Sequence, residues 1–174
     1  MSFDRAAFLD KLRDSYEYYY NVKTHEPDEN DDLPLAISAE FHARDEGYVL
    51  VKKAKIWAAE SNEYVFIFSA PSFNSETACR CIDYAIANCT DRIKPHSEHR
   101  SSFIIAVFVA DNIDFSVQKE ICRRKFDKSY KFGFHGWSTL KTATIDLEKE
   151  MIATNKPGED IGKFLKKLLR SEKV

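Results

Sequence analysis

Six cations lie close together in the second half of the chain, and aromatic residues stand among them. The cations are Lys119, Arg123, Arg124, Lys125, Lys128 and Lys131, and the aromatic residues are Phe126, Tyr130 and Phe132. Cationic side chains contact phosphates and aromatic rings stack on bases, so this basic run is a candidate surface for nucleic acid or another polyanion. The alternative is a solvated helix face followed by a strand whose aromatic side chains belong to the core.

A second candidate site lies on one face of a predicted pair of strands. Glu40 and His42 alternate with apolar residues in the first strand, and Lys53 and Lys55 alternate in the same way in the second. Side chains alternate between the two faces of a strand, so these four residues share one sheet face in the predicted register. Glu40 and Lys53 then lie diagonally opposite each other. The simplest interpretation of that pair is a cross-strand ion pair on a solvated face.

Other residues that could do chemistry lack the partners that the chemistry needs. His96 and His99, with Glu98 between them, fall in a predicted surface loop with no further metal ligand at a clear spacing, and Asp114 precedes a helix that it could cap. The sequence contains no Gly-rich phosphate loop, no Gly-x-Ser-x-Gly, no Cys-x-x-Cys and no His-Glu-x-x-His. We interpret the four cysteines as reduced structural thiols. The sequence therefore predicts no metal site and no cofactor, and it leaves open whether the protein is an enzyme.

Length and composition are those of one globular domain. The chain has 174 residues, of which 44% are hydrophobic and 31% are charged. No apolar run approaches the roughly 20 residues of a membrane span. The first ten residues contain acids, whereas a signal peptide would be basic and then apolar. We therefore expect a single domain over residues 1–174 that is cytoplasmic and has no membrane partner.

Charge is distributed unevenly along the chain, although the net charge is only −2. Residues 1–50 hold 12 acids and 5 bases, a balance of −7, and residues 115–174 hold 8 acids and 14 bases, a balance of +6. Such polarity can steer a partner or favour self-association. The alternative is that different surfaces simply carry different charges.

Hydrophobic periodicity predicts four helices and six strands. The helices are expected at 4–20, 75–93, 115–125 and 157–169, and the strands at 35–43, 48–60, 64–70, 102–111, 130–147 with a bend at Gly136, and 150–154. The runs at 64–70 and 102–111 are apolar on both faces, which is typical of strands covered by helices on both sides. The order αβββαβαββα indicates an α+β fold, a single layered domain with helices packed on a largely antiparallel six-stranded sheet.

The first three predicted strands should form a meander. Arg44-Asp-Glu-Gly47 reads as a turn, and an even-length turn pairs Ala43 with Tyr48 so that the apolar faces of both strands match. Glu60-Ser-Asn-Glu63 reads as the second turn.

The opening order αβββαβ resembles the restriction-endonuclease-like core, in topology only. Members of that class place an Asp on one strand and an acid-x-Lys on the next, to hold magnesium and to position water. Here Val51 stands where an acid would precede Lys53, and no charged residue occurs from Tyr64 to Ala70. The resemblance implies at most a divergent metal-dependent nuclease with a degenerate site at Glu40 and Lys53.

Several segments together resemble a family of uncharacterised bacterial proteins of about this length. They are Lys52–Phe68, His135-Gly-Trp137, Asp146-Leu147 and Thr154-Asn155. The resemblance covers nearly the whole chain and implies a single bacterial cytoplasmic domain of unknown function. It carries no site residue over to this chain.

Two classes of function fit these observations. The first is a non-catalytic cytoplasmic domain that acts through protein–protein contact or self-association, with a protein partner or as a homo-oligomer. It is supported by the lack of a catalytic constellation, by the 13 Phe and 8 Tyr residues, and by the opposed charges of the two ends. The second is a nucleic-acid-binding protein or divergent metal-dependent nuclease that uses the basic run, with Glu40, Lys53 and Lys55 as its sheet-face site.

Overall fold

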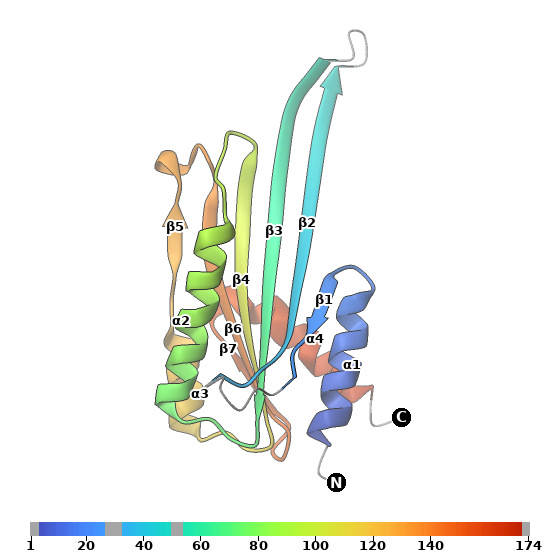
Figure 1. The fold of residues 1–174 in the computed structure, drawn as a ribbon, viewed down its shortest axis with the longest axis vertical. Helices are drawn as coiled ribbons and strands as arrows, with labels where there is room; N and C mark the ends of the chain where they lie inside the picture. The colour runs from blue at the N-terminus through green and yellow to red at the C-terminus, as the bar shows by residue number, and fades with distance from the viewer. Residues whose placement is uncertain (1–3, 27–32, 50–53, 172–174) are drawn as a thin grey trace.

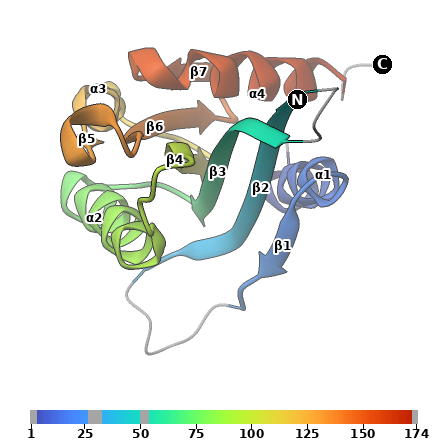
Figure 2. The ribbon, with the colours of Figure 1, turned by 90° about the horizontal axis from the view of Figure 1, so that it is seen from above.

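The computed structural model describes residues 4–26, 33–49 and 54–171, and it shows a mixed sheet between two pairs of helices (Figure 1, Figure 2). The helices are α1 (Arg5–Glu17), α2 (Ser75–Arg92), α3 (Phe115–Arg123) and α4 (Glu159–Arg170), with short 3-10 helices η1 (Lys131–Gly133) and η2 (Lys156–Gly158). The strands are β1 (Asn21–Thr24), β2 (Leu35–Val49), β3 (Ala54–Ala70), β4 (His99–Ala110), β5 (Asp127–Ser129), β6 (Trp137–Asp146) and β7 (Met151–Thr154). The predicted α+β class is confirmed.

The sheet has seven strands in the order β1-β2-β3-β4-β6-β5, and β7 also pairs with β6. β4 runs parallel to both β3 and β6, and the remaining pairs are antiparallel. The prediction of a largely antiparallel six-stranded sheet is therefore wrong. The physical reason is that α2 follows β3 and α3 follows β4, and each helix returns the chain to the end of the sheet at which the preceding strand begins. Such crossovers join parallel strands.

The predicted meander is replaced by one long hairpin, which extends beyond the other strands (Figure 1). Ala43 pairs with Ser61, and Tyr48 pairs with Lys55, so the predicted Ala43–Tyr48 pair is wrong. Residues 50–53, which join the two strands, lie outside the described residues. The expected turn at 60–63 is absent from β3 because this segment contains no Gly or Pro and pairs with β4, with one shift of register between Glu60 and Ser61.

Two short strands fall where the sequence predicted something else. β1 lies between the helix predicted at 4–20 and the strand predicted at 35–43, where no strand was expected, and it pairs with β2 so that Asn21 is opposite Glu40. β5 precedes the strand predicted from residue 130, where the chain instead forms η1. Gly133 and Gly136, with φ of +90° and +77°, allow the tight turns that break the predicted strand.

The core has two halves, one on each face of the sheet. On one face, α2 and α3 pack on Phe66, Phe68 and Phe108. On the other face, α1 and α4 pack on Ile67 and Val107. β4 lies between these layers and is almost fully buried, which confirms the interpretation of 102–111 as a covered central strand. No helix among the described residues is long and apolar enough to cross a membrane.

Candidate functional site

The most unusual local structure is the aromatic loop, residues 130–137, which connects β5 to β6. Within it the carbonyl of Tyr130 accepts hydrogen bonds from the backbone N–H groups of Gly133 at 3.0 Å and His135 at 3.1 Å. The Phe134 N–H donates to the carbonyl of Lys131 at 3.1 Å. These bonds close a tight turn at the end of the sheet from which the long hairpin projects (Figure 1).

The turn places two bulky residues in a left-handed backbone conformation. Lys131 has φ of +49° and Phe132 has φ of +56°. Residues other than glycine avoid this region, at a cost of about 1–2 kcal/mol each. Such strain persists only where surrounding contacts determine the conformation, and it is concentrated at functional segments.

Buried polar contacts hold the aromatic loop in place. The Tyr130 hydroxyl lies 2.5 Å from Ser138 Oγ, and the Tyr130 ring lies edge-on to His99 at 5.7 Å between centroids. His99 Nδ1 donates to the carbonyl of His135 at 2.5 Å, and His99 Nε2 lies 2.8 Å from Ser102 Oγ. His99 is buried at the start of β4, so its predicted place in a surface loop is wrong.

The loop presents aromatic side chains to solvent although its base is fixed. Phe132 is 98% exposed, Phe134 is 79% exposed and Trp137 is 42% exposed. Lys128 and Lys131 flank them, and the Lys128 ammonium lies 5.5 Å from the centre of the Tyr130 ring. The arrangement is a rigid platform of apolar rings with cations at its border.

The basic run does not form one patch. Lys119 and Arg123 are exposed on α3, where they line an open hollow with Arg124. Arg124 also forms an ion pair with Asp83 of α2. The remaining cations, Lys125, Lys128 and Lys131, are exposed along β5 toward the aromatic loop. Figure 1 shows α3 and the aromatic loop at opposite ends of β5.

The aromatic residues of the basic run divide in the same way. Phe126 and Tyr130 are partly buried against the α2 side of the core, and only Phe132 is exposed. The part of the run that combines charge with exposed rings is therefore its end, at Lys128, Lys131 and Phe132.

The sheet-face candidates are only partly brought together. Glu40 and His42 share a face of β2, with His42 Nε2 3.4 Å from Glu40 Oε2 and His42 Nδ1 2.7 Å from Asn62 Oδ1. Glu40 also forms an ion pair with Arg92 of α2. Lys55 is opposite Tyr48, far along β3 from Tyr64, which pairs with Glu40, and the separation is roughly 30 Å at strand spacing. Lys53 lies outside the described residues.

An ionic chain continues from this face to the loop before β4. Arg44 forms ion pairs with Glu60 and Glu98, and His96 Nε2 lies 2.8 Å from Glu60 Oε2. Each of these charges has a partner of opposite sign or a hydrogen bond, which is typical of a structural network. Among residues 4–26, 33–49 and 54–171, no group of three or more His, Cys, Asp or Glu side chains is placed to hold a metal ion.

Sequence reasoning missed Phe134 and Trp137 as surface residues, because residues 130–147 were interpreted as a strand with a bend at Gly136. The signal that could have found them is the pair of glycines at 133 and 136. Two glycines three residues apart are more typical of a turn than of a strand interior.

Comparison with known proteins supports the family resemblance. A family profile described as Domain of unknown function (DUF8052) matches residues 4–167. No curated protein and no solved structure matches the chain. The profile covers most of the chain and confirms the predicted resemblance to an uncharacterised family. The chain therefore belongs to the DUF8052 family, whose members share a domain of unknown function.

Proposed function

We propose that this protein is a non-catalytic binding domain that associates with a second copy of itself through the aromatic loop. The observation that carries the proposal is Phe132, which is 98% exposed on a left-handed backbone that buried contacts hold in place. A fully exposed, strained phenylalanine contributes nothing to the packing of its own chain. A role in contact with another surface accounts for both its exposure and its strain.

Aromatic side chains at the centre of an interface supply much of its binding energy. Phe132, Phe134 and Trp137 together offer such a centre, and Lys128 and Lys131 offer a polar rim. Because hydrogen bonds at Tyr130 and His99 already order the loop, association would cost little additional conformational entropy.

Two further features support association between copies in the cytoplasm. The negative balance of residues 1–50 and the positive balance of residues 115–174 favour contacts between opposite ends of two copies. All four cysteines are free thiols, as expected in a reducing compartment.

Analytical ultracentrifugation tests the proposal. We expect the wild-type chain to sediment with a mass above the 20.1 kDa of one copy, in a concentration-dependent manner. The double variant Phe132→Ala, Phe134→Ala should sediment as one copy. Phe115→Ala is the matched control, because Phe115 is 71% exposed on α3, away from the loop, and its removal should leave the mass unchanged. A wild-type chain that stays monomeric at high concentration would overturn the proposal.

The alternative is binding of single-stranded nucleic acid by the same surface. Lys125, Lys128 and Lys131 are exposed in and around β5 along the way to Phe132, and cations that lead to an exposed ring suit phosphate contact followed by base stacking. Fluorescence anisotropy with a single-stranded oligonucleotide would then show binding that weakens steeply as salt rises. Lys128→Glu should weaken that binding, whereas Lys156→Glu on η2 should not.

The nuclease form of the alternative has less support. Glu40 is neutralised by Arg92, Glu60 is neutralised by Arg44, and Lys55 is remote from both along β3. Magnesium-dependent cleavage of the oligonucleotide in the same assay would support the nuclease function again.

A further inference from the structure

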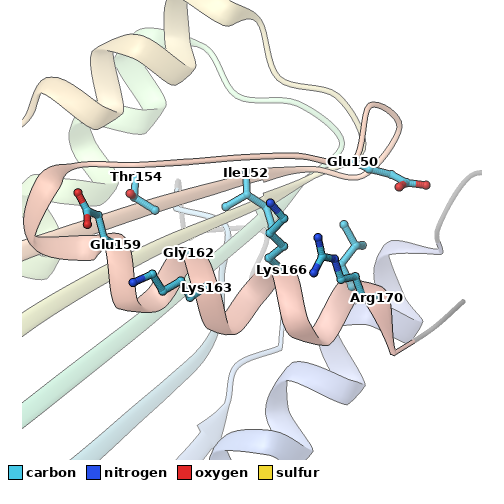
Figure 3. A pocket seen from close by; sticks show the side chains of 9 residues that line it. Glu150, Ile152, Thr154, Glu159, Gly162, Lys163, Lys166 and Arg170 are labelled. Atoms are coloured by element: carbon cyan, nitrogen blue, oxygen red, sulfur yellow. The ribbon is translucent and has the colours of Figure 1, made fainter.

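A groove of about 580 Å³ lies between β7 and α4 (Figure 3). Ile152 and Thr154 contribute its strand wall, and Gly162 and Leu169 contribute its helix wall. Gly162 allows close approach of the two walls, since a Cβ there would lie 2.7 Å from the Thr154 methyl group. This groove lies apart from the aromatic loop and is independent of the proposed function.

The helix wall of the groove carries three cations. Lys163, Lys166 and Arg170 recur at three and four residues, which places them on one side of α4 over about 10 Å. Figure 3 shows Lys166 extending toward Ile152. None of these three forms an ion pair with the part of the chain that the structure describes. Glu159 and Glu150 line the two ends of the groove.

The strand wall of the groove is a sheet edge. Within the described ranges β7 pairs only with β6, on one side. The Asn155 N–H donates to the carbonyl of Thr142, and hydrogen-bonded positions alternate along an antiparallel pair. The N–H and C=O groups of Ala153 therefore point toward β6, and those of Ile152 and Thr154 point to the outer edge.

We propose that the groove binds an acidic peptide segment in extended conformation, which pairs with β7 as an added strand. A strand added to β7 would continue the sheet over the cationic side of α4. Alternate side chains of that strand would face Lys163, Lys166 and Arg170, where the carboxylates of an acidic peptide would neutralise the three cations. The four residues of β7 span about 13 Å, which matches the length of the cationic row.

Fluorescence anisotropy tests the proposal with a labelled peptide of about ten residues that alternates Glu and Val. We expect this probe to bind the full chain. A probe of the same sequence with every backbone nitrogen methylated should not bind, because neither of its edges can donate hydrogen bonds to β7. A probe that alternates Lys and Val should not bind, because its charge is reversed. Equal binding of the methylated probe would overturn the strand model.

Charge reversal on α4 tests the groove itself. Lys166→Glu combined with Arg170→Glu should weaken the Glu-Val probe by more than about tenfold. Lys167→Glu is the matched control, because Lys167 is exposed on the same helix but does not line the groove, and it should retain wild-type affinity. An equal loss of affinity for the Glu-Val probe in Lys167→Glu would overturn the proposal. It would also be overturned if a single-stranded oligonucleotide bound more tightly than the probe and the Lys166→Glu, Arg170→Glu substitutions abolished that binding.

Discussion

The carboxylate of Asp146 accepts a hydrogen bond from the backbone N–H of Ile113 at 2.9 Å, and this contact joins the end of β6 to the entrance of α3. The same carboxylate accepts from the backbone N–H of Lys149 at 2.8 Å and lies 2.9 Å from the Lys149 ammonium. Asp146 thus ties together the β4–α3 connection and the β6–β7 turn. The first of these connections begins the crossover that joins the parallel strands β4 and β6.

Asp146→Asn should lower the free energy of unfolding by about 2 kcal/mol. The substitution removes the charge and one acceptor from a site that is almost fully buried. Urea denaturation followed by circular dichroism measures the loss. Glu148→Gln is the control, because Glu148 is exposed and accepts a hydrogen bond from the side chain of Asn112, so the substitution should change stability by a few tenths of a kcal/mol. Equal losses in the two variants would contradict the role assigned to Asp146.

The pKa of Asp146 lies below its ordinary value. Burial, the largest single influence, raises this pKa, but the hydrogen bonds from Ile113 and Lys149 and the charge of Lys149 together lower it by more. The unfolded chain has a pKa of about 3.9 at this residue, so the stabilisation is complete above that pH and is lost as the pH falls through the lower folded value.

Acid titration of the urea midpoint should reveal this group. We expect the wild-type chain to lose stability below about pH 4, and Asp146→Asn to lose less over the same range. If the two proteins show the same pH dependence in that window, other carboxylates dominate the acid transition.

The two glycines of the aromatic loop should respond differently to alanine. Gly133→Ala should cost about 1 kcal/mol, because φ is +90° and a new methyl group meets nothing within 4 Å. Gly136→Ala should cost about 3 kcal/mol or more, because its Cβ would overlap the carbonyl of Arg100 in addition to the strain at φ of +77°. Thermal or urea unfolding of the two variants gives the comparison. A Gly133 variant less stable than the Gly136 variant would show that the loop is not anchored at Arg100.

The cysteines should react with thiol reagents in the order of their exposure. Burial raises the pKa of Cys81 and of Cys89 to about 12, so almost no thiolate is present at pH 8. We expect Ellman's reagent to modify partly exposed Cys79 first and to reach Cys81 and Cys89 only after urea is added. Mass spectrometry of the modified peptides identifies the sites. Rapid modification of Cys89 in the folded chain would mean that α2 opens readily.

Local patterns in the sequence were enough to locate the helices and the central strand. Segment 102–111 is apolar on both faces, and β4 is buried on both faces, because the same side chains determine strand propensity and burial. The stripe on residues 157–169 likewise predicts α4, whose Leu165 and Leu168 face the core. The spacing of Gly133 and Gly136 already contained the signal for a turn, although the segment was interpreted as a strand.

Contacts between distant segments decided what the sequence alone did not. β3 continues through residues 60–63 because β4 pairs with it along that length, and this pairing moves every partner of β2 relative to the predicted register. His99 is buried because the carbonyl of His135 and the ring of Tyr130 close over it. The groove beside β7 likewise depends on the position of α4 against a sheet edge. Each of these features is stabilised by contacts between residues that are far apart in the chain, so the periodicity of one segment does not predict the feature.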